Sequence, residues 1–119
     1  MPVRPTHFEF YSNDPQGTVD LLTRAFGWSA RQWEGQEYWL LETGDGPGIN
    51  GGVVRSGDEG PMTMVTCEVE DIDAAVEAVG ISGGTLLTDV VELEGVGRWA
   101  QVEGPGGEVF GLMEPLNGA

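Results

Sequence analysis

The stretch that decides the fold is Thr6-His7-Phe8-Glu9-Phe10-Tyr11-Ser12-Asn13-Asp14-Pro15. Phe8 and Phe10 alternate with His7 and Glu9, which is the pattern of a β-strand with one apolar face. Asp14 suits a helix N-cap, and the proline that follows it suits the first helical position, where its missing N–H costs nothing. The stretch therefore predicts a strand that leads directly into a helix.

The same pattern returns 57 residues further along the chain, from Met64 to Ile72. Met64 stands where His7 stood, Asp71 where Asp14 stood, and Gly84 where Gly27 ends the first predicted helix. A constant offset of this kind is the signature of an internal repeat. The second copy keeps the strand and the helix cap but replaces the only histidine of the chain by methionine.

The remaining strands are predicted from alternating or β-branched runs bounded by turn residues. In the first copy they cover residues 28–33, 37–43 and 49–55, and in the second copy residues 85–93, 98–103 and 108–113, with a tail from residue 114. A glycine pair at 51 and 52 interrupts one strand, which indicates a bulge or a close backbone approach. The sequence thus predicts one α+β domain over residues 1–119. It is built from two βαβββ modules, at about 4–55 and 62–114, joined by a polar linker at 56–61.

The composition is that of a soluble protein with an unusual charge. Twenty acidic residues face five basic ones, all arginine, for a net charge of −15. Such a surface is a poor partner for nucleic acid, and no apolar run is long enough to span a membrane. The acidity has two interpretations, solubility in a salty environment or attraction of cationic ligands. One cysteine and the absence of a signal-peptide pattern predict a cytoplasmic protein.

Several motifs together resemble the vicinal oxygen chelate superfamily, which comprises glyoxalase I, extradiol dioxygenases, fosfomycin-modifying enzymes and bleomycin-binding resistance proteins. They are the opening His7 with Asp14-Pro15, the run Ala25-Phe26-Gly27-Trp28 after the first helix, and Gly104-Pro105-Gly106-Gly107 before the last strand. The resemblance implies that curved mixed sheets form a half-open barrel with one helix per module outside. It also implies a ligand or divalent metal in the concave side, and a homodimer.

The resemblance places the metal-ligand positions on the first and last strand of each module. The first position is His7, its counterpart is Met64, and the glutamate position of the last strand is Gly111. A catalytic divalent metal needs three or four histidine or carboxylate ligands, and thioether sulfur is a poor substitute. We therefore expect no metal cofactor; the alternative is a rearranged metal site at His7 and Glu9.

By alternation His7 points into the expected cleft, either as a hydrogen-bonding or general-base residue or as part of its polar wall. Residues 98–103 match residues 38–43, so Trp39 and Trp99 hold equivalent positions in the two modules, and they either line an aromatic cleft or pack in the core. Cys67 is predicted to be a small core residue. The candidate ligand-binding residues are His7, Glu9, Trp39, Met64, Thr66, Trp99 and Gly111.

The sequence therefore predicts a small-molecule-binding protein of the glyoxalase and bleomycin-resistance type, not an enzyme, that sequesters an aromatic or cationic compound. The alternative is a metal-dependent lyase, isomerase or dioxygenase of the same superfamily with its site at His7 and Glu9.

Overall fold

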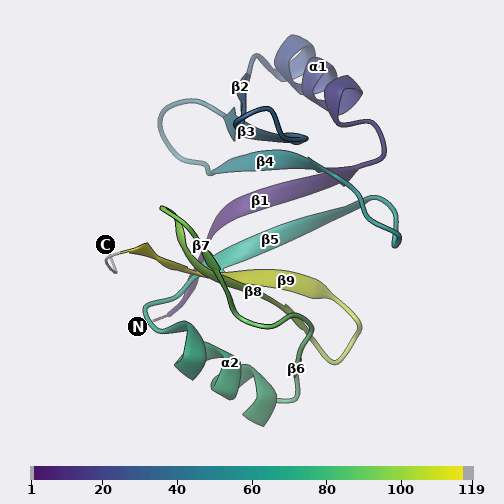
Figure 1. The fold of residues 1–119 in the computed structure, drawn as a ribbon. Helices are drawn as coiled ribbons and strands as arrows, with labels where there is room; N and C mark the ends of the chain where they lie inside the picture. Colours follow the sequence, from purple (N-terminus) through teal and green to yellow (C-terminus); the bar gives the residue numbers. More distant parts are fainter. Residues whose placement is uncertain (1, 117–119) are drawn as a thin grey trace. The chain divides into compact units, whose positions relative to one another are not determined.

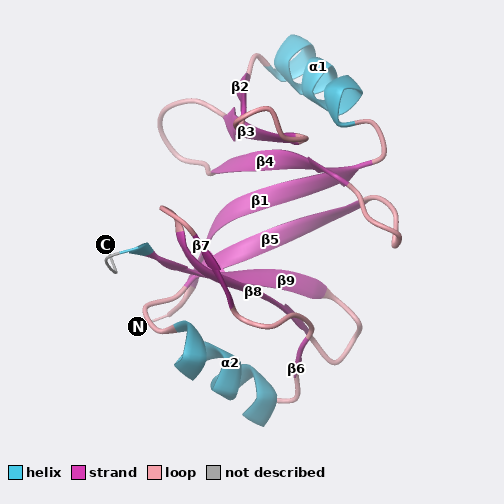
Figure 2. Cartoon of the chain, in the orientation of Figure 1, coloured by secondary structure: helices cyan, strands magenta, loops and turns pink. Residues whose placement is uncertain are grey.

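The computed structural model describes residues 2–116. Residues 117–119, which the sequence analysis assigned to a tail, lie outside the described part. Contacts divide the described residues into two compact units, residues 6–64 and residues 65–116 with residues 2–5. Each unit contains a sheet and one helix, so the fold class is α+β as predicted (Figure 1; Figure 2). None of the helices within residues 2–116 has the length and apolar character needed to cross a membrane.

Module one follows the predicted βαβββ order. Its elements are β1 (Arg4–Ser12), α1 (Pro15–Phe26), β2 (Ser29–Gln32), β3 (Tyr38–Glu42) and β4 (Asn50–Arg55). The strands are arranged β2-β3-β4-β1; β1 and β4 run parallel, and the other two pairs are antiparallel. The order of elements was thus predicted correctly, with bounds that differ by one or two residues.

The start and end of α1 have the causes that the sequence indicated. The Asp14 carboxylate accepts a hydrogen bond from the backbone N–H of Gly17 at 3.0 Å, and Pro15 occupies the first turn. Gly27 closes the helix in the left-handed conformation, with φ 74°, and its N–H donates to the Thr23 carbonyl.

The core of module one lies between α1 and one face of its sheet. It contains Val19 and Leu22 from the helix and Trp39, Leu41 and Val53 from the strands. Phe8, Phe10, Trp28 and Ala30 pack against this cluster. Phe26, at the end of α1, is 62% exposed and has its ring centroid 5.2 Å from that of Trp28.

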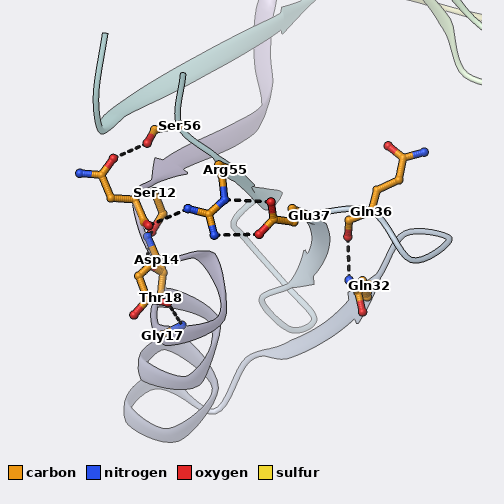
Figure 3. A network of polar contacts seen from close by, with 10 residues as sticks. Ser12, Asp14, Gly17, Thr18, Gln32, Gln36, Glu37, Arg55 and Ser56 are labelled. Carbon is orange, nitrogen blue, oxygen red and sulfur yellow. Dashed lines mark hydrogen bonds and ion pairs between the residues drawn. The ribbon is translucent and has the colours of Figure 1, made fainter. Parts of the chain in front are cut away.

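A polar network joins the ends of β1, β3 and β4 (Figure 3). The Arg55 guanidinium donates to both carboxylate oxygens of Glu37 at 2.8 Å and to the Asn13 carbonyl at 2.9 Å. In the same region the Ser12 hydroxyl accepts from the Asp14 N–H at 2.9 Å and bonds the Thr18 hydroxyl at 2.7 Å. These bonds tie the start of α1 to the strand that precedes it.

Module two repeats this plan with one difference. Its elements are β5 (Met62–Glu68), α2 (Ile72–Ile81), β6 (Thr85–Leu86), β7 (Val91–Leu93), β8 (Gly97–Glu103) and β9 (Val109–Pro115). β9 lies between β5, to which it is parallel, and β8, and both β6 and β7 pair with β8.

The single strand predicted at 85–93 is therefore wrong, because the structure divides it into β6 and β7. The Thr88 hydroxyl accepts a hydrogen bond from the Gln101 N–H at 2.9 Å, so a side chain takes the place of a backbone partner at the break.

The core of module two lies between α2 and its sheet and consists of Val69, Ile72, Ala100, Val102 and Leu112. The Asp71 carboxylate caps the helix by accepting from the N–H groups of Asp73 and Ala74. The helix ends at Ser82 and not at Gly84, where the repeat predicted its end. Cys67 packs against this core, as predicted, and partial burial raises the pKa of its thiol.

Candidate functional site

The sheet face of module one opposite to α1 carries the polar side chains. Because neighbours along a strand alternate between faces, the residues that flank the core residues share this second face. We call it the His7 face; it comprises His7, Glu9, Arg31, Tyr38, Leu40, Glu42, Asn50 and Gly52.

A hydrogen-bonded cluster occupies the centre of the His7 face. The Tyr38 hydroxyl donates to Glu9 Oε2 at 2.5 Å, and His7 Nε2 lies 3.4 Å from the same hydroxyl. His7 Nε2 is also 3.7 Å from Glu9 Oε2, and the Tyr11 hydroxyl donates to Glu9 Oε1 at 3.5 Å. The sequence analysis placed His7 and Glu9 on one strand face, and the structure brings them together.

Exposure differs within this cluster. The Glu9 side chain is only 12% exposed, whereas that of His7 is 30% exposed. Glu9 therefore lies beneath the surface, held by two phenols, and His7 is more accessible than Glu9 to a ligand. A buried carboxylate needs such partners, because burying it without hydrogen bonds is costly.

Tyr38 is the member of the cluster that the sequence analysis did not select. Burial, followed by the nearby Glu9 carboxylate, raises the pKa of the Tyr38 phenol above its ordinary range. The phenol is thus held in its protonated form and acts as a hydrogen-bond donor. The signal that could have identified Tyr38 was the glycine pair in the neighbouring strand.

Gly51 and Gly52 make room for aromatic side chains on opposite faces of β4. A Cβ at Gly52 would lie 2.5 Å from the Tyr38 hydroxyl oxygen, and one at Gly51 would lie 2.5 Å from the Phe8 ring. Both glycines have negative φ angles, which other residues can also adopt. Glycine is therefore required here because a larger side chain would not fit, and not because of the backbone conformation. The glycine pair was predicted to mark a bulge or a close backbone approach, whereas the nearest neighbours are aromatic side chains.

An open depression of about 410 Å³ lies beside the cluster. It is lined by His7, Arg31, Leu40, Leu41, Glu42, Asn50 and Gly51, all from module one. None of Arg31, Glu42 and Asn50 was among the predicted ligand-binding residues, because single polar or charged residues in strands carry no motif. Of the predicted site residues, the depression contains His7.

Strand register identifies the equivalent positions in module two. Gly52 pairs with Glu9 and Leu40, and Gly111 pairs with Thr66 and Gln101. Thr66 is therefore the counterpart of Glu9 and Gly111 that of Gly52.

The same registers correct the predicted match of the two tryptophans. Val53 pairs with Trp39, and Leu112 pairs with Ala100, so Trp39 corresponds to Ala100 in the core. Trp99 pairs with Met113 and corresponds to Tyr38. The sequence alignment was displaced by one residue, and a shift of one residue moves a strand side chain to the other face.

Trp39 is therefore a core residue and does not line the His7 face. Trp99, partly exposed, lies on the face opposite to α2, which we call the Thr66 face; it comprises Thr66, Trp99, Gln101 and Gly111. On that face Thr66 is only 3% exposed, and its hydroxyl has no hydrogen-bond partner among the residues described.

The residues at the superfamily's metal positions do not fit a divalent metal. Of the three positions named above, only His7 supplies a suitable ligand, because Met64 is a buried thioether and Gly111 has no side chain. Gly52, the counterpart of Gly111 in module one, has no side chain either. The Tyr38 hydroxyl fills the space beside Gly52. Within residues 2–116 no group of three or more His, Cys, Asp or Glu side chains is placed to hold a metal ion. We derive no chemical step through a metal.

No protein-family model and no curated protein matches the sequence significantly. Solved structures do match. A methylmalonyl-CoA epimerase from Mycobacterium tuberculosis has a TM-score of 0.70 at 18% identity, covering 93% of this chain and 87% of that one. A hypothetical protein from Bacillus halodurans C-125 has a TM-score of 0.73 at 12% identity, covering 100% and 99%.

A methylmalonyl-CoA epimerase in complex with methylmalonyl-CoA and NH4+ has a TM-score of 0.68 at 16% identity, covering 98% of this chain and 97% of that one. At such identities the similarity concerns the fold. The chain therefore shares the fold of these structures, and this is the two-module α+β fold that was predicted.

Proposed function

We propose that this protein binds a small organic molecule, without a metal, in the depression on the His7 face of module one. The observation that supports it best is the position of His7, which lines the depression and belongs to the Glu9–Tyr38 cluster. Small-molecule sites are typically concave, with a few polar groups fixed in place by their neighbours.

The cluster determines which hydrogen bonds His7 can make. Tyr38 has one hydroxyl proton and gives it to Glu9, so in the contact with His7 the phenol oxygen accepts. His7 Nε2 then carries a hydrogen, and in the neutral ring Nδ1 is an acceptor. A ligand with a hydrogen-bond donor suits this arrangement.

The predicted ligand class changes in one respect. Trp39 lies in the core, so it contributes no aromatic wall to the depression. Glu42 lines the depression and is exposed, and it supports the cationic part of the prediction.

The second candidate function is an enzyme that acts through His7 and Glu9. It is supported by the hydrogen-bonded chain of a carboxylate, a phenol and an imidazole, which are groups able to hold or transfer a proton. Several structures with this fold are epimerases in complex with coenzyme A esters or analogues. Coenzyme A carries several phosphates, and a chain with a net charge of −15 is electrostatically unfavourable for it.

Because the chain has one histidine, its Hε1 proton gives a single imidazole signal in NMR spectra. We expect compounds that raise the melting temperature to shift this signal, and His7→Ala to weaken their binding at least tenfold. Asp45→Asn, a change in an exposed loop, serves as the matched control and leaves binding unchanged.

Three results would contradict this proposal. One is a set of stabilising compounds that leave the His7 signal unmoved, another is a screen without any binder, and the third is a stoichiometric metal whose removal abolishes binding. Turnover that decreases in the Glu9→Gln variant and persists in the presence of a metal chelator would favour the second candidate function, an enzyme. The expected homodimer and cytoplasmic location stay predictions; light scattering at several salt concentrations tests the first.

A further inference from the structure

Three of the five arginines, Arg4, Arg24 and Arg31, have guanidinium groups without an ion pair among residues 2–116, and Arg31 is the one of these three that lines the depression. Arg55 pairs with Glu37, and Arg98 pairs with Asp73 and Glu114. Arg31 has no hydrogen bond or ion pair among residues 2–116, and it lines the depression on the His7 face. In a chain with twenty carboxylates and five arginines, this cation is left available at the candidate site.

Glu42 lines the same depression and is also unpaired among the described residues. Ser29 pairs with Glu42 and Arg31 pairs with Leu40, so Arg31 and Glu42 are diagonal neighbours on one sheet face. Side chains of this length can meet across such a diagonal, roughly 7–8 Å between Cα atoms. No ion pair joins them, and both charges remain free for a ligand.

Asn50 adds an oriented donor to this wall. Its Oδ1 accepts from the Thr43 N–H at 2.9 Å and from the Thr43 hydroxyl at 3.3 Å. These bonds fix the amide, and its NH₂ group has no partner among the residues described. Leu40 supplies apolar surface between the charged side chains.

We infer that the ligand of this depression is amphoteric, with a carboxylate that pairs with Arg31 and an ammonium that pairs with Glu42. The inference depends on the proposed function and specifies its ligand class. A guanidinium fork matches a carboxylate in geometry. A purely anionic ligand would be repelled by the net charge of −15, whereas a zwitterion carries no net charge.

Three matched probes test this inference: phenylalanine, 3-phenylpropionate, which lacks the ammonium, and 2-phenylethylamine, which lacks the carboxylate. Binding is followed by the His7 Hε1 signal. We expect phenylalanine to bind at least tenfold more tightly than either single-charge probe. In the Arg31→Gln variant, phenylalanine should bind no more tightly than 2-phenylethylamine. In the Glu42→Gln variant, phenylalanine should bind no more tightly than 3-phenylpropionate.

Arg24→Gln, an exposed arginine on α1 outside the depression, is the matched control and should change nothing. Circular dichroism verifies that each variant is folded. Compounds from a general screen could shift the His7 signal while neither the charges of the probes nor the Arg31→Gln and Glu42→Gln substitutions change the affinity. In that case the inference of an amphoteric ligand is wrong, and the proposed binding site is retained. If neither the probes nor the screen shifts the signal, the proposed function fails as well.

Discussion

The His7 face and the Thr66 face occupy equivalent places in the two modules and differ in what fills them. In module one the central positions hold Glu9 and Tyr38, which satisfy each other by a hydrogen bond at 2.5 Å. In module two the same positions hold Thr66 and Trp99, and the Thr66 hydroxyl has no partner among the residues described. Both modules retain the aspartate cap and a glycine in the last strand.

This difference shows which parts of the repeat the fold requires. Helix caps and core faces are needed in each module for its own stability, and they recur. The face opposite to the helix is constrained less, and only in module one does it combine a buried carboxylate, a phenol and a histidine. The candidate chemistry is therefore concentrated in one module.

The largest effect is expected from the two tryptophans. Trp39→Ala removes a buried core side chain and should lower the free energy of unfolding by about 3–5 kcal/mol. Trp99→Ala, at a partly exposed position opposite to α2, should cost about half of that or less. Urea unfolding followed by circular dichroism measures both. Equal losses, or a larger loss for Trp99→Ala, would contradict the register that distinguishes the two faces.

A methyl group at Gly52 should disrupt the cluster on the His7 face. Gly52→Ala places a Cβ 2.5 Å from the Tyr38 hydroxyl oxygen, and we expect a loss of about 1–3 kcal/mol in unfolding free energy. Gly57→Ala is the control, since its Cβ has no atom within 4 Å. Combined with Tyr38→Ala, the Gly52→Ala substitution should add little, because the clash is gone. Additive losses in this double variant would refute the assigned contact.

Alkaline pH should destabilise the protein through Tyr38. The folded state raises the pKa of this phenol, so above pH 10 the unfolded chain loses a proton that the folded protein keeps. Stability should fall with rising pH, with a slope of up to about 1.4 kcal/mol per pH unit from this group, and Tyr38→Phe should reduce the slope.

The sequence contains one other tyrosine, so the variant Tyr11→Phe isolates Tyr38 for spectroscopy. Absorbance of its phenolate at 295 nm should appear only together with loss of the circular dichroism signal. Phenolate absorbance near pH 10 in the folded variant would show that the environment of Tyr38 is not as described.

The smallest effect is expected at Thr66. Thr66→Val removes an unpaired buried hydroxyl while retaining shape, so the stability should be unchanged or rise by up to about 1 kcal/mol. Thr18→Val, which removes a hydroxyl bonded to Ser12 at 2.7 Å, should instead cost about 1 kcal/mol. Thermal unfolding compares the two. A marked loss of stability in Thr66→Val would mean that this hydroxyl has a hydrogen-bond partner. The Thr66 face would then resemble the His7 face more closely than described.

Local patterns predicted most of the fold. The caps at Asp14 and Asp71 and the alternation in β1 depend on neighbouring residues, so they were predicted correctly. Two predictions were wrong: the end of α2 at Gly84 and a single strand over residues 85–93, which is divided into β6 and β7. Both features depend on contacts with another strand or with a side chain such as Thr88.

The candidate site was predicted in part. His7 and Glu9 lie two residues apart on one strand, so alternation alone placed them together. Tyr38, Arg31 and Glu42 come from two other strands, and their position beside His7 depends on register between strands. A single-residue error in the alignment of the two modules was enough to match Trp39, a core residue, with Trp99 on the opposite face.

The sequence by itself determined the repeat, the helix caps and the faces of β1. These properties follow from spacing along the chain and from residue chemistry. Only the tertiary structure decided that Tyr38 occupies the space beside Gly52, that Trp39 belongs to the core, and that an unpaired Arg31 lines the depression with His7. Such properties depend on which residues of separate strands lie opposite each other, and no local pattern specifies that pairing.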